Sequence, residues 1–560
     1  MTQCIIQRPG TSHPGAAFTP RVRAALDRAE LCGTKPTAHS SARCKTNPIE
    51  ANAKPRFRLN NTEMSRFRHA RRCKTNPSRC PARTRAGART NPTAHSSARR
   101  LAFLLIAVLA LAAQSHAAPS TRPNIVLVIS DDQRYDCLGA AGNPNIVTPA
   151  QDRLAKEGTL YRQATIHVPQ CSPSRATLLT GLAPHQHGWY SNQAAESKRT
   201  ESGSFSKLPM LPALLKDAGY QTVFVGKWHL QLEPWDAGFA DVRTWLPGGG
   251  GPYEDANLAH GNSRKRTTQK GFINQIFGDD AVAFLNSDNA KKQPFFLWLA
   301  LTAPHMPIQP NPADIQKLYA GKSRTELAPP TFPKEKAELG DWQHYYEACT
   351  MADRQLASVL DALDRAKLAD NTVVIYLGDN GFMMGGRDMS AYGKGKRPFM
   401  GKVFPFEDSV RVPIIVRAPG AKAGPSDAPM SSLDLPPTIL SYAGLTPPAK
   451  WAGRDLHHAD EIKESVCEFA DNESDKFGDV AYRLVRTPDA KLIVWESKGR
   501  KDELYDLKND PRETKDLIDD PAAAEMKADL LSRLKKWMAA TEDPALKWPH
   551  ISSDTKGSAQ

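Results

Sequence analysis

The sequence predicts an α/β fold in which a mainly parallel, mixed sheet lies between helices, and a smaller C-terminal domain adds an antiparallel sheet and a helix. Uninterrupted apolar runs such as Asn124–Ser130 are typical of strands buried on both faces, and therefore of a parallel sheet. Segments of helical periodicity separate these runs, as at Leu356, Val359, Leu360 and Leu363. With 24% charged and 40% hydrophobic residues, the 560-residue chain is neither a polytopic membrane protein nor a wholly disordered one.

The first hundred residues differ from the rest in charge and pattern. They hold 21 of the 74 Lys and Arg but only 4 of the 60 Asp and Glu, so the other 460 residues have a net charge of −3. Residues 37–43 recur at 93–99. A basic tail that binds nucleic acid or anionic lipid is one interpretation. We favour the other, that residues 1–98 are disordered or not translated, because they lack a core and the remainder has no electrostatic footprint for nucleic acid.

Residues 99–117 have the three parts of a secretory signal peptide. Two arginines precede thirteen apolar residues at 101–113, and residues 115–117 form a small-x-small cleavage site. Thirteen residues are too few to span a bilayer, so no stable membrane insertion is expected. We expect export, with the protein periplasmic or secreted after cleavage near Ala117.

Four apolar runs each end in polar residues that can do chemistry. The runs are Asn124–Ser130, 222–225, 294–301 and Thr372–Gly378. In the same order, they are followed by Asp131 and Asp132, by Lys227 and His229, by His305, and by Asp379 and Asn380. Taken singly, each of these would be a turn, capping or structural residue. Ligands bind open α/β sheets at the carboxyl ends of strands, so the four ends together predict one site.

The acidic residues that follow two of these runs indicate a bound metal ion. Asp131, Asp132, Asp379 and Asn380 offer oxygen ligands, which hard cations prefer, whereas zinc prefers His and Cys. We expect one Ca²⁺ per chain, with Mg²⁺ as the second choice. Three carboxylates brought together would repel each other without a cation, which supports this expectation.

Between the first two runs lies Cys171, in the segment CSPSRATLLTG. Ser-Pro followed by Ala-Thr-Leu-Leu predicts the first turn of a helix, with Cys171 at its N-terminus, where the helix dipole favours an anion. On the residues alone, Cys171 is a low-pKa nucleophile, half of a disulfide or a buried thiol.

This segment matches the C-x-P-x-R signature of the type I, formylglycine-dependent sulfatases of the alkaline phosphatase superfamily, which include the arylsulfatases. The resemblance runs from about residue 122 to 540 and is specific. It includes the Asp pair after the opening strand, the Lys/His motifs at 226–229 and 303–305, the second metal motif at 378–381, the later Lys with the segment 407–413, and the hairpin at 503–511. Residues 181–190 resemble the glycosaminoglycan-directed members, such as heparan N-sulfatase.

The resemblance implies that Cys171 is oxidised to formylglycine by a formylglycine-generating or anaerobic maturation enzyme. The hydrated aldehyde then attacks sulfur as a nucleophile. By similarity, Asp379 helps to deprotonate that nucleophile, and His305 protonates the leaving oxygen. His229 takes the proton from the second hydroxyl.

The same resemblance assigns the cations and the metal ligands. Arg175 and Lys227 hold the hydrated aldehyde, while Lys227, Lys402 and the metal neutralise the sulfate oxygens. The implied metal ligands are Asp131, Asp132, Cys171 in its modified form, Asp379 and Asn380.

The region after Asp379-Asn380 departs from the common family pattern. Residues 381–400 form a longer loop than in many relatives, and this loop carries Lys394, Lys396 and Arg397. One of these lysines could replace Lys402, or the loop could bind an anionic substrate. A solvated charged loop is the alternative interpretation.

Two further motifs have weaker interpretations. His185 and His187 have the spacing of a metal site, but with an oxygen site already present we expect a loop at the rim of the site or ordinary loop packing. The four glycines at 248–251 are expected to form a flexible loop rather than a phosphate cradle.

We expect residues 118–445 to form the catalytic domain and residues 446–560 the smaller C-terminal domain. In the latter, residues 482–486, 492–495 and 504–506 predict short antiparallel strands, and an apolar stripe from Met526 to Trp537 predicts an amphipathic helix.

The expected function is that of a sulfuric ester hydrolase, acting on a sulfate ester or sulfamate of a sulfated carbohydrate. A phosphonate or phosphate monoester hydrolase of the same superfamily is the alternative. A non-catalytic glycan-binding relative would have lost ligands, and the chain has lost none. No nucleic-acid partner is expected.

Overall fold

The computed structural model describes residues 122–192, 205–392, 398–471, 480–496 and 499–552. All of them belong to one of the two units into which the chain divides, Ser96–Gln560. The expectations for residues 1–117, and for Lys394, Lys396 and Arg397, lie outside the described residues. Within the described ranges, no helix has the length and apolar character that crossing a membrane requires.

Ten strands form one large mixed sheet, in the order β10-β2-β9-β8-β1-β7-β3-β4-β5-β6. Its centre is β8 (Thr372–Gly378), β1 (Asn124–Ser130), β7 (Phe295–Ala300) and β3 (Gln221–Lys227), all parallel. The four apolar runs are therefore neighbours, as the sequence predicts. The outer strands are β2 (Thr159–Tyr161), β4 (Asp241–Leu246), β5 (Asn257–His260), β6 (Arg266–Thr268), β9 (Ile414–Arg417) and β10 (Gly424–Ser426).

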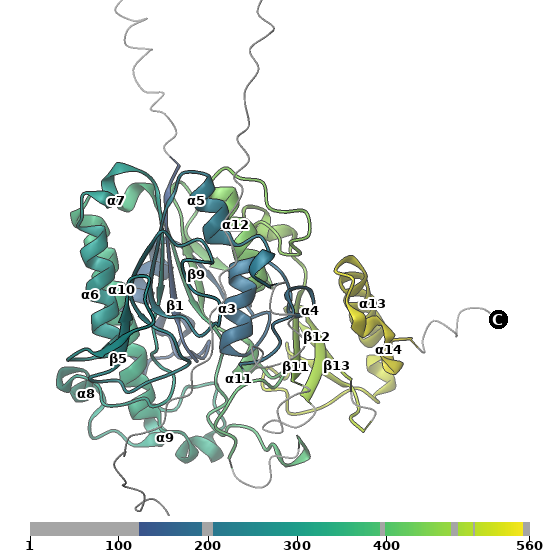
Figure 1. The fold of residues 1–560 in the computed structure, drawn as a ribbon. Coiled ribbons are helices and arrows are strands. Elements are labelled where there is room, and N and C mark those ends of the chain that lie inside the picture. The colour runs from purple at the N-terminus through teal and green to yellow at the C-terminus, as the bar shows by residue number, and fades with distance from the viewer. Residues whose placement is uncertain (1–121, 193–204, 393–397, 472–479, 497–498, 553–560) are drawn as a thin grey trace, which may run out of the picture. The chain divides into compact units, whose positions relative to one another are not determined.

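The sheet is covered by helices on both faces, which explains why its central strands are apolar throughout (Figure 1). Alternate residues of β1 enter different cores: Val126 and Val128 join one hydrophobic cluster, and Ile125 and Leu127 join the other. On the first face lie α2 (Pro149–Glu157), α6 (Ile273–Leu285) and α10 (Trp342–Arg365). On the second face lie α3 (Cys171–Thr180), α5 (Leu211–Asp217) and α12 (Leu435–Tyr442).

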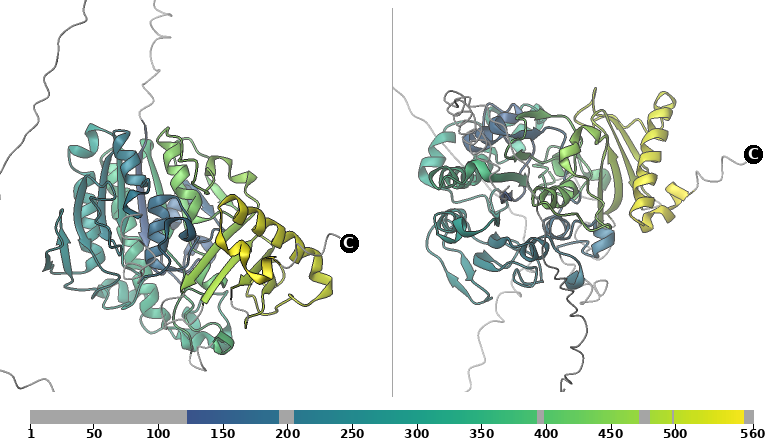
Figure 2. Two further views of the ribbon diagram at one scale, coloured as in Figure 1. Left: turned by 45° about the vertical axis from the view of Figure 1, so that its right-hand side comes forward. Right: turned by 90° about the horizontal axis from the view of Figure 1, so that it is seen from above.

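A second, four-stranded antiparallel sheet follows, in the order β11-β12-β13-β14. Its strands are β11 (Ser465–Asp471), β12 (Val480–Arg486), β13 (Ala490–Trp495) and β14 (Glu503–Asp506). One face packs on α13 (Ala524–Ala540), the predicted amphipathic helix, which Figure 2 shows in yellow on the outer side of this sheet. The other face packs on a segment around Phe404 and Phe406. The predicted fold class is confirmed in both parts.

Short helices complete the described chain. They are α4 (Pro184–His187), α7 (Asn289–Lys292), α8 (Ala313–Tyr319), α9 (Arg324–Leu327), α11 (Glu407–Val410) and α14 (Pro549–Ser552). Single 3₁₀ turns lie at Gly139–Ala141, Phe205–Lys207, Lys334–Leu339, Ala369–Asn371, Ser390–Tyr392, Ser432–Asp434, Leu456–Glu461, Pro521–Ala523 and Pro544–Lys547.

The two histidines of α4 are packing residues. The His187 ring lies 3.1 Å from the Thr177 hydroxyl, and its Nδ1 accepts a 3.0 Å hydrogen bond from the Trp189 backbone. His185 contacts Glu468 of β11 and thereby joins the large sheet's part of the chain to the small sheet. Of the two interpretations of this motif, loop packing is the one that fits.

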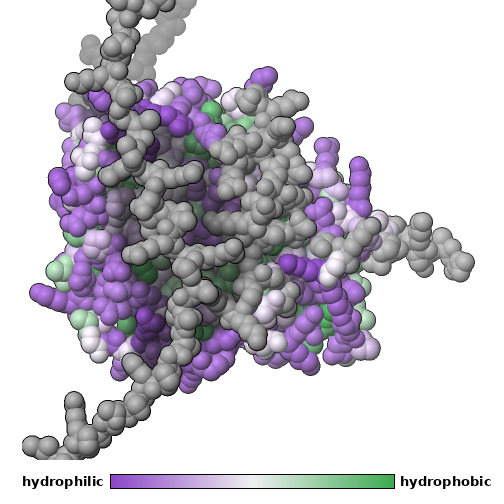
Figure 3. Space-filling model, turned by 60° about the horizontal axis from the view of Figure 1, so that its bottom comes forward, coloured by the Kyte–Doolittle hydropathy of each residue, from purple (hydrophilic) through white to green (hydrophobic). Residues whose placement is uncertain are grey.

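The described surface on the face that Figure 3 shows is mainly hydrophilic, with small, scattered hydrophobic areas. Among the described residues, the large hydrophobic side chains that are exposed are Val147, Met306, Leu318, Leu339 and Met400. Single exposed apolar residues are ordinary, but a group of them in one place calls for an explanation.

Candidate active site

The polar residues that follow β1, β3, β7 and β8 meet at one edge of the sheet. These strands are parallel and adjacent, so their carboxyl ends lie side by side. Direct contacts join nearly the whole predicted set: Asp131, Asp132, Cys171, Arg175, Lys227, His305, Asp379, Asn380 and Lys402. The predicted convergence is therefore present in the structure.

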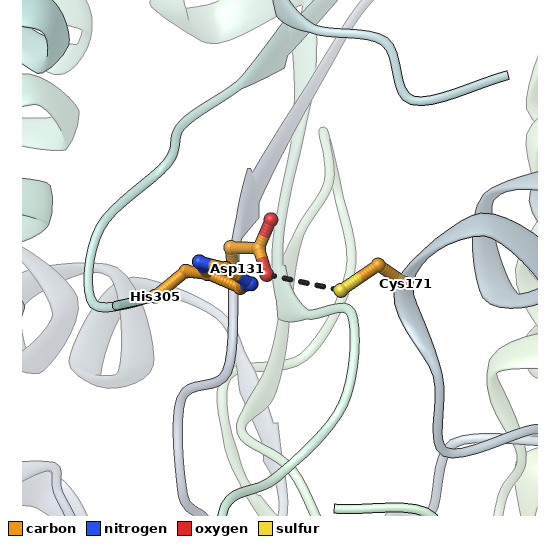
Figure 4. Close-up of side chains that lie close together, drawn as sticks. All are labelled: Asp131, Cys171 and His305. Carbon is orange, nitrogen blue, oxygen red and sulfur yellow. Dashed lines mark hydrogen bonds between the residues drawn. The ribbon is translucent and has the colours of Figure 1, made fainter. Parts of the chain in front are cut away.

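Cys171 is the first residue of α3 and is fully buried. Its Sγ donates to Asp131 Oδ1 at 3.3 Å and accepts from Lys402 Nζ at 2.8 Å. Figure 4 shows the first of these contacts, with His305 beside Asp131. Burial, followed by the charge of Asp131, raises the pKa of the thiol. Cys171 is a free, buried thiol that forms no disulfide with any other described cysteine, so the disulfide interpretation does not hold among the described residues.

Arg175 holds two of the carboxylates in place. From the second turn of α3, its guanidinium reaches Asp131 Oδ2 at 3.1 Å and Asp379 Oδ2 at 2.9 Å. Its Nη1 donates to the Lys227 carbonyl at 2.7 Å. The planar, branched guanidinium can bridge acceptors in this way, whereas a lysine could not.

The buried carboxylates are crowded, and their pKa values move in opposite directions. Burial raises the pKa of Asp131, but Lys227, His305 and Arg175 lower it more, and the net shift is downward. Burial and the neighbouring charge of Asp131 raise the pKa of Asp379 to about 6. Like charges at this separation favour protonation of one member or the presence of a cation.

The donor set fits a hard cation. One ligand atom from each of Asp131, Asp132, Cys171 and Asp379 lies within 4.8 Å of the others, and all four residues are buried. The Asn380 Nδ2 donates to Asp132 Oδ1 at 2.6 Å, while its Oδ1 is buried without a hydrogen-bond partner. An unpartnered amide oxygen beside three carboxylates provides the oxygen ligands that hard cations prefer.

The two predicted histidines flank this cluster. His305 Nε2 lies 3.9 Å from Asp132 Oδ2, and its Nδ1 contacts the Met306 carbonyl at 2.6 Å. His229 has a buried Nδ1 without a hydrogen-bond partner, and its carbonyl accepts from the Ser172 hydroxyl. Burial, followed by the positive charge of Lys227, lowers the pKa of both rings.

The structure places Lys402 at the centre of the site, in contact with Asp132 as well as with Cys171. The sequence left its assignment open, because the preceding loop is longer than in many relatives. Its position is fixed by packing from outside the large sheet, since the residues just after it contact β12 and β13 of the small sheet.

Sequence reasoning missed two residues that shape the site. The Tyr345 hydroxyl donates to the Asp132 carbonyl, although Tyr345 reads as a core position of α10. Gly249 belongs to the glycine run interpreted as a flexible loop. A Cβ built on it would overlap the His229 ring, and one on Gly250 would lie 3.5 Å from His305 Cε1. Because glycine has no Cβ, the backbone at Gly249 can lie close to the His229 ring. The run of glycines in the sequence does not by itself indicate this role.

Two family models match the chain. The model described as "Sulfatase" covers residues 123–445. The model described as "N-sulphoglucosamine sulphohydrolase, C-terminal" covers residues 395–540.

Individual proteins agree with these models. The N-acetylgalactosamine-6-sulfatase of Mus musculus is 32% identical over 380 residues, which are 62% of this chain and 67% of the relative. A protein solved in complex with its substrate, D-glucosamine-2-N,6-O-disulfate, is 25% identical with a TM-score of 0.61 and covers 76% of this chain and 99% of its own.

A phosphonate monoester hydrolase of Agrobacterium radiobacter is 21% identical with a TM-score of 0.58, over 75% of this chain and 96% of its own, a likeness that shows the fold alone. The sulfatase model by contrast matches more than half of this chain and includes the strand ends, α3 and the acidic cluster that could hold a metal. The chain belongs to the sulfatase family and is an enzyme that hydrolyses sulfate esters.

Proposed function

We propose that the protein hydrolyses a sulfate ester of a sulfated, glycosaminoglycan-type carbohydrate, using formylglycine made from Cys171 and one bound Ca²⁺. The observation that carries the proposal is the position of Cys171. Its Sγ lies at a helix N-terminus, between Asp131 at 3.3 Å and the ammonium of Lys402 at 2.8 Å. A nucleophile placed there attacks a group whose negative charge the surrounding cations can neutralise.

Asp131, Asp132, Asp379 and Asn380 would hold the Ca²⁺, together with the modified side chain at position 171. When bound, the ion supplies positive charge at the sulfate oxygens. Formylglycine, when formed, supplies a hydrated aldehyde whose hydroxyl is the nucleophile. Mg²⁺ is the weaker candidate, because the ligands come from three separate segments and Mg²⁺ demands stricter octahedral geometry.

The cations of the chain serve two different purposes. Arg175 has all its contacts with Asp131, Asp379 and the Lys227 carbonyl, so it orients the carboxylates and the start of α3. Lys227 and Lys402 both reach the cluster, where they pair with Asp131 and Asp132. A sulfate group bound there would gain from the two ammonium groups, which would lower its repulsion with the acidic site.

The histidines provide the proton transfers. His305 is partly exposed, at 24%, and lies between the cluster and the surrounding solvent, where a leaving oxygen would emerge. With Nδ1 donating to the Met306 carbonyl, Nε2 would give the proton from the doubly protonated ring, a form that Asp132 and Asp131 favour against the effects of burial and Lys227. His229 is deeper, and its unpartnered Nδ1 can hold the proton of a hydroxyl on the residue at position 171.

The substrate assignment draws on the relatives. One acts on N-acetylgalactosamine 6-sulfate by its name, and another has glucosamine-2-N,6-O-disulfate as its substrate. Both are sulfated amino sugars, which supports a sulfated carbohydrate for this chain. We further propose export through the signal at residues 99–117, with a mature N-terminus near Ala118, and modification by a formylglycine-generating or anaerobic maturation enzyme. N-terminal sequencing of the exported protein tests the export.

A paired assay tests the function. The matured enzyme is expected to hydrolyse 4-nitrophenyl sulfate with a much higher kcat/KM than 4-nitrophenyl phenylphosphonate. Both esters release the same alcohol, so the comparison isolates the choice between sulfur and phosphorus. Preference for the phosphonate would overturn the proposal in favour of a phosphonate monoester hydrolase of the same fold.

A further inference from the structure

A small pocket opens directly beside the metal-binding cluster. It encloses about 130 Å³ and begins at Asp132. One wall comes from the segment after His305, with Met306 and Ile308, and the opposite wall comes from Phe382, Met384 and Met400. Because Asp132 contacts Lys402 and lies near His305, the pocket continues the active site instead of forming a separate one.

The side chains of this pocket are largely apolar, and two of them are exposed. Met306 is 53% exposed and Met400 is 44% exposed, whereas Phe382 and Met384 are buried below them. Leu339, another exposed hydrophobic residue, is as close as Met400 Sδ to a Cβ built on Gly385, at 3.5 Å. Two of the five exposed large hydrophobic residues in the described chain therefore line this pocket and a third lies near Met400, which is the mark of a binding surface.

Both charged side chains that line this pocket are carboxylates. Asp132 and Asp341 line it, and no lysine or arginine does so within the described ranges. Asp341 is 38% exposed and is paired only with the His344 ring, at 2.9 Å. Asp132 is paired with Lys402, so Asp341 is the carboxylate that would repel a second anion, by roughly 1 to 4 kcal/mol at 4 Å depending on the local dielectric constant.

The pocket lies on the leaving-group side of the site. It is bounded by the segments that carry His305, the proposed acid, and Lys402, a proposed sulfate-binding cation. The bridging oxygen of a sulfate ester held at the cluster would face His305, and the next residue, Met306, lines this pocket together with Met400. The alcohol part of the sulfate ester would therefore contact methionine side chains, whose flexible thioethers adapt to irregular apolar shapes.

We propose that this pocket binds the sulfated sugar through an uncharged, apolar surface, such as the methyl of an N-acetyl group or the C–H face of a hexose. It selects a sugar whose only charged group is the scissile sulfate over a sugar that carries a second sulfate near it. The inference rests on the proposed function, since it concerns the alcohol released from the sulfate. It separates this chain from the structural relative whose substrate is a disulfated glucosamine.

Binding and turnover test the pocket together. Calorimetry on the Cys171→Ala variant with bound Ca²⁺ compares an N-acetylhexosamine monosulfate with the same sugar carrying one further sulfate. The monosulfate is expected to bind at least about tenfold more tightly, and kcat/KM of the matured enzyme should show the same preference. Equal or tighter binding of the disulfate would overturn the inference.

A charge substitution gives a second, independent readout. Met400→Lys adds a cation at an exposed position of the mouth and should reduce or reverse the preference for the monosulfate. Leu318→Lys is the matched control, because Leu318 is similarly exposed, at 41%, but lies on α8 and does not line the pocket. An unchanged preference in Met400→Lys would overturn the subsite alone, whereas absence of any sulfatase activity in the matured wild-type enzyme would overturn the proposed function.

Discussion

The Tyr482 hydroxyl donates a 2.8 Å hydrogen bond to the carbonyl of Val403, the residue next to Lys402. Tyr482 lies on β12 of the small sheet and is fully buried. From β13, Lys491 Nζ donates to the Pro405 carbonyl at 3.1 Å. Two strands of the small sheet thus hold the backbone that presents Lys402 to Cys171. We infer that this sheet positions a residue of the active site.

Tyr482→Phe should therefore lower kcat on an aryl sulfate about fivefold, since one hydrogen bond contributes about 1 kcal/mol and its loss lets Lys402 move. Tyr505→Phe is the matched control. Tyr505 is a buried tyrosine of the same sheet whose hydroxyl binds Glu503, far along the chain from Lys402. In urea unfolding, Tyr505→Phe should lower the free energy of unfolding about as much as Tyr482→Phe does, but it should keep the wild-type kcat. Equal effects on kcat in both variants would show that the small sheet acts only through stability.

This dependence also shows what the sequence could and could not predict. The four strand ends were predictable because parallel neighbouring strands put their carboxyl ends at one edge, and each end is marked by its own apolar run. The position of Lys402 was not, because it is set by Tyr482 and Lys491, about 80 to 90 residues later, and no local pattern connects them. The role of Gly249 was hidden for the same reason: only the fold reveals that its missing side chain makes room for His229.

Cys171→Ala should reduce turnover by roughly four orders of magnitude while leaving the fold intact, because the residue supplies the nucleophile and has a small side chain. Cys349→Ala is the matched control, since Cys349 is also a buried free thiol but lies within α10. It should keep full kcat. Mass spectrometry of the peptide that contains position 171 should show the formylglycine mass in active wild-type protein. Active protein with an unmodified thiol there would contradict the mechanism.

Asp132→Asn and Asp379→Asn should each weaken Ca²⁺ binding at least about tenfold, because each removes one negative charge from the ligand set. Calorimetric titration of the chelator-treated protein measures the affinity. Asp353→Asn is the control: this buried carboxylate accepts hydrogen bonds from the backbone of Ala150 and Gln151, at 3.1 and 2.7 Å, and is no member of the cluster. It should change stability but not Ca²⁺ affinity. Full activity after exhaustive chelation would refute the metal assignment.

The last prediction concerns His185, which joins α4 to the C-terminal part. Its Nδ1 lies 2.7 Å from Glu468 Oε2 and its Nε2 lies 3.1 Å from the Thr541 carbonyl. Both neighbours are acceptors, so only the doubly protonated ring satisfies both. Burial lowers the pKa of His185, but Glu468 and Asp543 raise it more, against the opposing charge of Arg483, and the net shift is upward.

A pKa that is higher in the folded than in the unfolded state stabilises the fold below the unfolded pKa. This stabilisation is lost as the pH rises through the folded pKa. The difference in free energy of unfolding between wild type and His185→Gln should therefore be about 2 kcal/mol near pH 5.5 and should shrink by pH 9. Urea unfolding at a series of pH values measures it. His457→Gln, which removes an exposed contact with Asp455, should show little difference at any pH. A His185→Gln difference that stays constant over this range would show that the ring is neutral in the folded protein.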